Sequence, residues 1–226
     1  MKVAIIGAGN VGKALGTSIG KAGHDVIFAS TGDSAKAAAA QVGEKAGTAS
    51  PRDAVAQADI VILATPYTAT RDVASEIEGT VADKIVIDAT NPVAPDMSGL
   101  ATERGTSAAE NIGRWMPGAS MVKAFNTMFA TNMGNPTGLG EQVDALFATD
   151  DENARERVAT LLADMGFRPV WVGGLARARE LESMAFLNIL LQVSTGGYWN
   201  TAYKLMAPPA AALEHRVAAG AGASTK

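Results

Sequence analysis

A glycine-rich turn near the start of the chain constrains the fold more than any other feature. Residues 7–12 read Gly-Ala-Gly-Asn-Val-Gly, between the apolar run 3–7 and a stretch of small residues typical of a helix. In this setting the first glycine permits a tight turn, the second lets the backbone approach a pyrophosphate, and the third lets helix and strand pack closely. A plain glycine-rich connection is the alternative. The turn predicts a dinucleotide site formed by Gly7, Gly9, Asn10, Val11 and Gly12.

The end of the next predicted strand, at 25–30, indicates which dinucleotide is bound. Turns of this kind that bind NAD have an acidic residue there, which bonds the ribose 2′-hydroxyl. Here the strand ends at Ser30, Thr31 follows, and Asp33 comes several residues late. The two hydroxyls and the nearby Lys36 can form a nest for a phosphate. We therefore expect NADP(H) rather than NAD, with ordinary turn chemistry and a solvated Lys36 as the alternative.

Alternating strand-like and helix-like segments predict the fold class. The predicted strands are 3–7, 25–30, 59–66, 84–92, 120–127, 142–150 and 168–173. This alternation predicts an α/β protein with a Rossmann-type, doubly wound, mostly parallel sheet and a small C-terminal helical region. We expect an NADP-binding domain at 1–174, a helical region at 175–206 that is bent or broken at Gly196–Gly197, and a low-complexity tail at 207–226.

Composition excludes several classes of partner and site. With 19 basic and 23 acidic residues the formal charge is −4, which makes nucleic acid a poor general partner. There is no cysteine, and the only histidines are His24 and His215, so we expect no metal site. No signal-peptide pattern precedes the first strand, and the apolar run at 184–193 is too short to span a bilayer. We expect a cytoplasmic protein with a small-molecule substrate or cofactor and no membrane partner.

Polar residues follow two neighbouring predicted strands. Thr65, Pro66 and Tyr67 follow one strand, and Asn91 and Pro92 follow the next. Ligands of open α/β sheets bind at the carboxyl ends of the strands, so these residues should meet the nicotinamide ribose. Loop chemistry alone is the alternative for both groups.

Asn126 ends the predicted strand 120–127 at the same edge of the sheet. Its amide could touch the nicotinamide or a hydride acceptor, and a buried Asn that caps a loop is the alternative. Hydride transfer between two cofactors depends mostly on positioning and on excluding water, so no general acid or nucleophile is required.

Three further stretches resemble one family. They are "ATNP" at 89–92, "MVKAFNT" at 121–127 and "GGLARARELESMAFL" at 173–187. With the glycine-rich turn they resemble the NADPH-dependent coenzyme F420 reductases, over roughly residues 1–206. They are also similar to the oxidoreductase domain of the six-transmembrane metalloreductases. The resemblance implies a Rossmann fold, NADP(H), and hydride transfer to a flavin-like cofactor, either coenzyme F420 or FMN/FAD, with Asn126 as the catalytic position.

The chain departs from the family pattern at two positions. Members specific for the deazaflavin have His where this chain has Asn126, and the family commonly has Arg where it has Thr31. An Asn lacks the charge and the ring face of an imidazole. The resemblance therefore supports the fold and the nicotinamide cofactor more firmly than it supports the acceptor.

Two other classes of function remain open from the sequence. A reductase of a small carbonyl or imine would need a proton donor, for which Tyr67, Lys123 and Tyr198 are candidates without a supporting spacing. A β-hydroxyacid dehydrogenase would share the first domain, but the lysine that it needs four residues before Asn188 is absent, because Met184 stands there. A non-catalytic dinucleotide sensor is the second class.

The last predicted helix suggests two further features. Arg179 and Glu182 are three residues apart, so we expect them to pair with each other. The apolar character of this region favours docking against a second copy of the chain, so we expect a homodimer.

Overall fold

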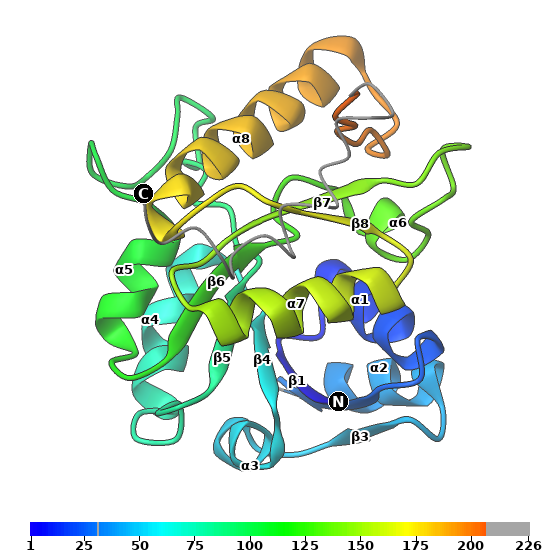
Figure 1. Ribbon diagram of the computed structural model, residues 1–226, viewed down its shortest axis with the longest axis vertical. Coiled ribbons are helices and arrows are strands. Elements are labelled where there is room, and N and C mark those ends of the chain that lie inside the picture. Colours follow the sequence, from blue (N-terminus) through cyan, green and yellow to red (C-terminus); the bar gives the residue numbers. More distant parts are fainter. Residues whose placement is uncertain (31, 207–226) are drawn as a thin grey trace, which may run out of the picture.

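The computed structural model describes residues 1–30 and 32–206 of the 226 residues. Thr31 and the predicted tail at 207–226 lie outside the described residues. Within them, eight strands form one sheet in the order β3-β2-β1-β4-β5-β6-β7-β8 (Figure 1). The strands are β1 (Lys2–Ile6), β2 (Asp25–Ala29), β3 (Ala46–Thr48), β4 (Ile60–Leu63), β5 (Ile85–Asp88), β6 (Ser120–Ala124), β7 (Asp144–Ala148) and β8 (Arg168–Trp171).

The sheet is mostly parallel. Neighbouring strands pair in parallel everywhere except between β6 and β7, so β7 and β8 run opposite to the other strands. The sheet thus confirms the predicted fold class, a doubly wound α/β protein with a small C-terminal helical region.

Helices cover both faces of the sheet (Figure 1). The α-helices are α1 (Asn10–Lys21), α2 (Ser34–Val42), α3 (Pro51–Gln57), α4 (Tyr67–Glu76), α5 (Ala108–Trp115), α6 (Ala130–Met133), α7 (Glu152–Asp164) and α8 (Ala178–Thr195), with a 3₁₀ turn η1 (Leu175–Arg177) before α8. Successive side chains of a strand point to opposite faces. Val3 and Ile5 therefore pack in a core with α1, α2 and α7, whereas Ala4 and Ile6 pack in a second core with α3, α4 and α5.

Small residues let α1 lie against the sheet. A Cβ added at Gly12 would stand 2.0 Å from the Gly7 carbonyl oxygen, and one added at Gly16 would stand 2.2 Å from the Phe28 ring. Gly7 itself has φ +108, which a residue with a side chain rarely adopts. These glycines fix the N-terminus of α1 at the carboxyl edge of the strands.

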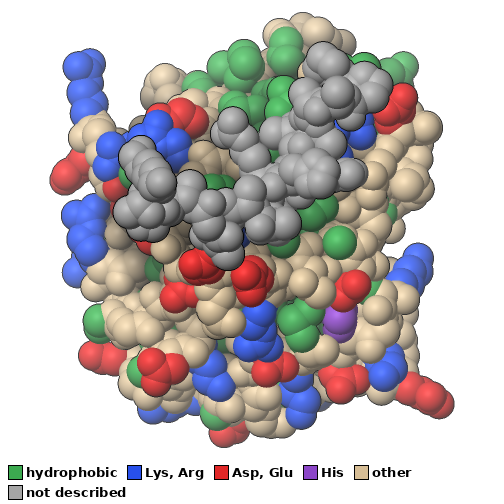
Figure 2. Space-filling view, in the orientation of Figure 1, with side chains coloured by type: hydrophobic (Ala, Val, Ile, Leu, Met, Phe, Trp, Pro, Cys, Tyr) green, Lys and Arg blue, Asp and Glu red, His purple; other side chains and the backbone are tan. Residues whose placement is uncertain are grey.

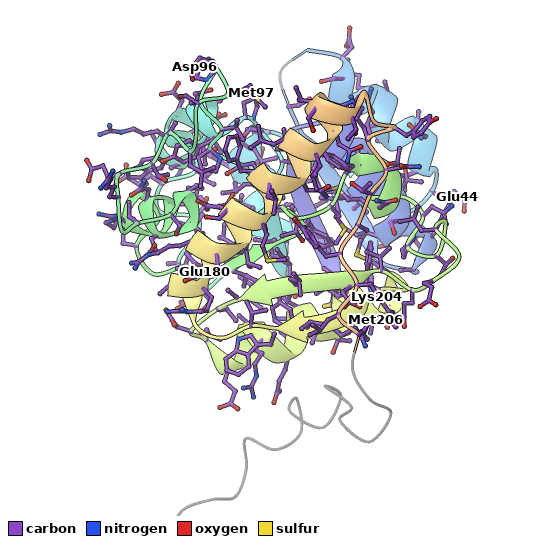
Figure 3. The ribbon with its side chains drawn as sticks, turned by 90° about the horizontal axis from the view of Figure 1, so that it is seen from above. Glu44, Asp96, Met97, Glu180, Lys204 and Met206 are labelled. Carbon is purple, nitrogen blue, oxygen red and sulfur yellow. The ribbon has the colours of Figure 1, made fainter. Side chains whose placement is uncertain are left out.

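Helix α8 lies across the carboxyl edge of the sheet, and the view from above shows it running diagonally over the strands (Figure 3). It ends at Gly196, whose φ of 62 is left-handed. Residues 197–206, here called the return segment, then run back beneath it. Helix does not resume there, because the Asn132 amide of α6 binds the carbonyl oxygens of Asn200 and Thr201. The predicted break is confirmed, and the predicted helix beyond it is wrong.

Two short elements were missed by the sequence analysis. Strand β3 is an edge strand of three residues with the sequence Ala-Gly-Thr, and helix α6 has four residues. Neither is long enough to show a hydrophobic period. The predicted boundary at residue 174 falls between β8 and η1, and the division into domains stays a prediction. Within residues 1–30 and 32–206, no helix combines the length and the apolar character needed to cross a membrane.

Candidate functional site

Two hollows open at the carboxyl edge of the sheet. The large cleft has a volume of about 660 Å³ and lies at the ends of β1, β2 and β4. The small pocket, of about 190 Å³, lies between α1, the ends of β5 and β6, and α8. Gly7 and Ala8 line the large cleft and Val11 lines the small pocket, so the glycine-rich turn borders both.

The turn leaves open space at one of its three glycines. A Cβ added at Gly9 would meet no atom within 4 Å, and the backbone there has φ −74 and ψ −165, which any residue adopts. The fold therefore does not need a glycine at this position, whereas a pyrophosphate lying against the backbone would need one. The neighbouring N–H groups of Asn10, Val11 and Gly12 belong to the first turn of α1, where helical N–H groups have no intrahelical partner.

The large cleft carries hydroxyl groups at the end of β2. Ser30 and Ser34 both line it, and their Oγ atoms lie 2.7 Å apart. Lys36 does not line the cleft, and its ammonium lies 3.2 Å from the exposed carboxylate of Asp33. The residues at the end of β2 thus offer neutral hydrogen-bonding groups to the cleft, and the role predicted for Lys36 stays a prediction.

The loop after β4 forms another wall of the large cleft. Thr65 and Pro66 line it, and Pro66 stands immediately before the first residue of α4. Tyr67 faces another way, because its ring stacks on Trp115 at 6.1 Å and its hydroxyl accepts a hydrogen bond from Asn111. Tyr67 therefore packs against α5, and its predicted contact with the cofactor stays a prediction.

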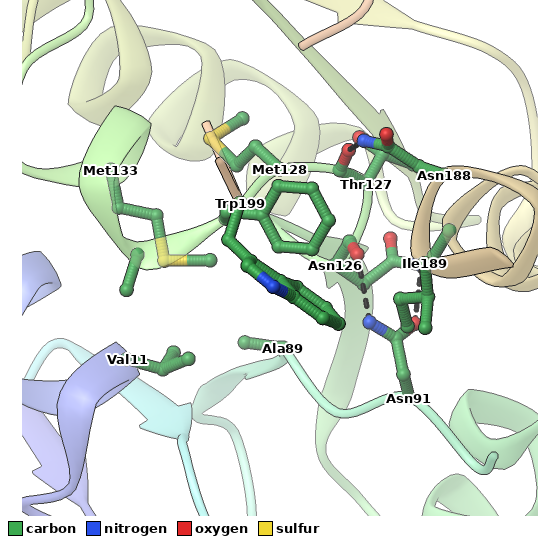
Figure 4. Close-up of a pocket in the computed structure, with 13 residues that line it drawn as sticks. Val11, Ala89, Asn91, Asn126, Thr127, Met128, Met133, Asn188, Ile189 and Trp199 are labelled. Carbon is green, nitrogen blue, oxygen red and sulfur yellow. Dashed lines mark hydrogen bonds between the residues drawn. The ribbon is translucent and has the colours of Figure 1, made fainter. Parts of the chain in front are cut away.

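The small pocket has apolar walls and a polar floor (Figure 4). Its walls include Val11, Met128, Met133, Ile189 and the indole of Trp199, and its floor carries amide groups. Asn91 and Asn126, predicted from separate strands, meet there, with the Asn91 amide donating to the Asn126 carbonyl oxygen at 2.8 Å. Pro92 is buried beside Asn91 and is not part of the lining.

The side-chain amide of Asn126 is held through its nitrogen atom. Its Nδ2 donates to Asn91 Oδ1 at 3.1 Å and to the Leu181 carbonyl oxygen at 3.0 Å. Both partners are acceptors, which fixes the orientation of the amide. Its Oδ1 is buried and has no partner among the described residues. Asn126 can therefore accept a hydrogen bond in the pocket, and it has no proton to transfer.

A buried ion cluster lies beneath this floor. The Lys123 ammonium is fully buried and lies 2.8 Å from Asp88 and 2.9 Å from Glu182. It also donates to the Thr90 carbonyl oxygen at 2.7 Å. Glu182 in turn accepts from the N–H group of Ala108 at 3.0 Å. The cluster thus ties β5, β6, α8 and the N-terminus of α5 together, directly below Asn91 and Asn126.

The charge of Lys123 is stabilised by its two partners. Burial alone lowers the pKa of a lysine, but the nearby carboxylates of Asp88 and Glu182 outweigh it, so the pKa of Lys123 lies above its ordinary value of 10.5. Lys123 is absent from the lining of the small pocket. A permanently charged and buried ammonium is a poor proton donor to a substrate in that pocket.

The expected pairing of Arg179 with Glu182 is wrong. Glu182 faces inward to Lys123, and Arg179 forms a two-pronged pair with Glu110 of α5, with Nε to Oε2 at 2.9 Å. This pairing keeps the pKa of Glu110 below its ordinary value. Arg179 and Glu182 do not pair, because α8 contacts α5 on one side and β6 on another. Each residue instead pairs with a residue outside the helix, Arg179 with Glu110 and Glu182 with Lys123.

Sequence reasoning missed several residues of the small pocket. Met128, Asn188 and Trp199 line it, and they come from segments far apart in the chain. Only the Gly196–Gly197 break gave a signal for Trp199, because it indicated that the chain changes direction there. Tyr198, a candidate proton donor, is 89% exposed and does not line the pocket.

Comparison with known proteins places these features in a family. The family model described as NADP oxidoreductase, coenzyme F420-dependent, matches residues 2–92. A protein of Methanothermobacter thermautotrophicus named F420-dependent NADP reductase is 34% identical over 211 residues, covering 85% of this chain and 90% of that protein. The chain belongs to the coenzyme F420-dependent NADP oxidoreductase family.

Other relatives agree with this assignment. A crystal structure from Arthrobacter sp. FB24, described as a putative F420-dependent NADP reductase, superposes with a TM-score of 0.82 at 25% identity and covers 92% of this chain and 100% of that one. The metalloreductase STEAP3 of Rattus norvegicus is 28% identical over 187 residues, which cover 81% of this chain and 36% of that protein. As a member of this family, the chain is an NADP-dependent oxidoreductase.

The open space at Gly9 and the closed space at Gly12 predict opposite effects of substitution. We expect Gly9→Val to leave the melting temperature nearly unchanged and to weaken NADPH binding by about 100-fold, because the side chain occupies the place of the pyrophosphate. We expect Gly12→Ala to lower the melting temperature by several degrees, because its Cβ meets backbone. Calorimetric titration and thermal melting measure the two effects. Unchanged NADPH binding by Gly9→Val would place the dinucleotide elsewhere.

The buried cluster predicts a large and pH-dependent loss of stability in Lys123→Met. Leaving Asp88 and Glu182 without their cation costs about 3–5 kcal/mol. The control Lys45→Met removes an exposed pair and costs at most about 1 kcal/mol. The folded pKa of Lys123 is raised, so its contribution is complete below the ordinary value of 10.5 and is lost as the pH rises through the folded pKa. Denaturant melts at pH 8 and at a series of pH values above 10.5 should show that the difference in stability between Lys123→Met and the wild type narrows as the pH rises. A difference that stays constant would contradict this assignment.

Proposed function

We propose that this protein transfers hydride between NADP(H) and coenzyme F420. The observation that carries the proposal is the turn shared by the two hollows, with Gly7 in the large cleft and Val11 in the small pocket. A dinucleotide laid along this turn extends from one hollow to the other. The relatives named F420-dependent NADP reductase support coenzyme F420 as the second substrate.

The large cleft is the proposed adenosine site. Ser30 and Ser34 would meet the 2′-phosphate there, and Thr65 and Pro66 would wall the ribose side. Contacts of the 2′-phosphate with Thr31 and Lys36 are part of the same proposal. The pyrophosphate would lie against Gly9 and the first N–H groups of α1. No carboxylate stands at the end of β2 to repel a phosphate, which favours NADP(H) over NAD.

The small pocket is the proposed place of hydride transfer. Asn91 holds the Asn126 backbone, and the free Oδ1 of Asn126 would accept a hydrogen bond from an N–H group on the edge of a bound ring. The apolar walls exclude water from the two rings. In this arrangement Asn126 orients a ring and transfers no proton. The hydride step itself needs no general acid or base from the protein.

We also propose a homodimer that forms through α8. Hydrophobic side chains gather along the upper edge of the molecule over this helix (Figure 2), and Leu187, Leu191 and Val193 are 54%, 49% and 57% exposed. Large apolar side chains exposed on a helix are typical of a protein interface. A monomeric mass by light scattering at micromolar concentration would refute the dimer.

A cytoplasmic location is likewise a proposal, which cell fractionation tests.

The residues at the end of β2 predict which of NADPH and NADH binds more tightly. We expect NADPH to bind about tenfold more tightly than NADH, equivalent to one extra charge-assisted contact. Ser30→Asp should reverse this order, because a carboxylate at the end of β2 repels the 2′-phosphate and bonds a 2′-hydroxyl. Ser183→Asp adds the same charge on α8 and should leave the order unchanged. Titration of each variant with both cofactors at fixed salt measures this, and equal affinities in the wild type would end the NADP assignment of the cleft.

The proposed reaction is tested by anaerobic oxidation of NADPH with coenzyme F420, and with FMN and FAD as comparison acceptors. We expect F420 to be reduced faster than either flavin. Asn126→Ala should lower turnover by about tenfold or more while NADPH affinity changes little, because the amide orients the ring pair. Asn153→Ala, on the exposed surface of α7, is the control. If coenzyme F420 does not speed NADPH oxidation above background, the proposed function fails.

A further inference from the structure

Trp199 is a large aromatic residue in an unusual setting. Its indole lines the small pocket and is nevertheless 47% exposed (Figure 4). It meets the Phe129 ring edge-on, with centroids 5.3 Å apart and an interplanar angle of 77°. One edge of the indole is thus fixed by packing, and the ring contributes a wall to the pocket.

The backbone holds the indole in this place at a cost. Trp199 has φ 53, a left-handed conformation that is uncommon for any residue with a bulky side chain. Its N–H group donates to Gln192 Oε1 at 3.1 Å, and its carbonyl oxygen accepts from Thr131 Oγ1 at 2.9 Å. Hydrogen bonds from α8 and α6 therefore fix this conformation from two sides.

A chain of polar contacts connects the return segment to the pocket floor. Gln192 Nε2 donates to Thr201 Oγ1 at 2.8 Å, and Thr201 Oγ1 donates to Asn188 Oδ1 at 2.5 Å. Asn188 Nδ2 then donates to the Thr127 carbonyl oxygen at 3.4 Å, next to Asn126 in the chain. The position of Trp199 is thereby set relative to the strand end that carries Asn126.

The pocket itself indicates which kind of ligand the indole meets. Apolar walls opposite one another, with a buried and unpartnered Asn126 Oδ1 at the floor, suit a flat conjugated ring that carries an N–H group on its edge. With the indole in place the volume is about 190 Å³, below the roughly 300–1,000 Å³ of common ligand sites. A tricyclic ring therefore enters only if the indole rotates about its side-chain bonds, while the hydrogen bonds still hold the Trp199 backbone, and then lies against the ring.

We propose that Trp199 is the stacking wall of the hydride-acceptor site. The indole covers the face of the planar acceptor that points away from the nicotinamide. This inference rests on the proposed function for the identity of the acceptor. Trp199 is a binding residue in it, and the return segment holds that residue in position.

The kinetic test uses Trp199→Ala and Trp199→Phe with Trp171→Phe as the control, since Trp171 lies on β8 against Arg155 and outside the pocket lining. We expect Trp199→Ala to raise the KM for coenzyme F420 by about tenfold, the usual worth of one ring stacked on an aromatic side chain. Trp199→Phe should recover most of this loss. The dissociation constant of NADPH and the melting temperature should stay close to those of the wild type in all three variants.

A second readout follows the indole directly. We expect the fraction of tryptophan emission lost on adding coenzyme F420 to fall in Trp199→Phe and to be retained in Trp171→Phe. An unchanged KM for F420 in Trp199→Ala overturns the proposal. So does a rise in the NADPH dissociation constant equal to the rise in KM, because the indole would then only close the pocket.

The same titration separates this inference from the proposed function. If the wild type does not oxidise NADPH with coenzyme F420, the proposed function fails, and the emission titration with F420 and with FMN still tests the stacking wall. A loss of tryptophan emission that depends on Trp199 supports the stacking wall for a ring that binds without reacting. If neither F420 nor FMN changes the emission, the stacking wall is overturned.

Discussion

The arrangement of the candidate site depends on the fully buried contact of Lys123 with Asp88 and Glu182. Three charges removed from water are costly unless each is paired and hydrogen-bonded, and here both carboxylates also accept backbone N–H groups. A small displacement of any of the four elements would leave a charge unpaired in the interior. The cluster therefore permits one relative position of β5, β6, α5 and α8.

The buried cluster also positions the amide groups at the floor of the small pocket. Lys123 binds the carbonyl oxygen of Thr90, and the next residue, Asn91, holds the Asn126 backbone. Asn126 in turn donates to the Leu181 carbonyl oxygen, one residue before Glu182. The polar floor of the small pocket is therefore a second layer, built on the buried charges and aligned by them.

Much of the fold and part of the site could be predicted from the sequence, and the division between the two has a physical cause. It was possible to predict the places of the glycine-rich turn, Asn91 and Asn126 from the sequence, because local chain geometry at the end of a strand fixes each of them. Glu182 and Trp199 were not, because their positions depend on how α8 lies over the sheet. For Glu182, helical spacing gave the wrong partner, since tertiary packing turned its side chain inward.

The two hollows are completed at different points along the chain. The large cleft uses residues up to Glu76, whereas the small pocket needs α8 and Trp199 from the last described part of the chain. During synthesis on the ribosome, the segments that line the large cleft emerge well before the segments that complete the small pocket. A chain that ends before α8 therefore has every residue that lines the large cleft and lacks Ala185, Asn188 and Trp199 of the small pocket.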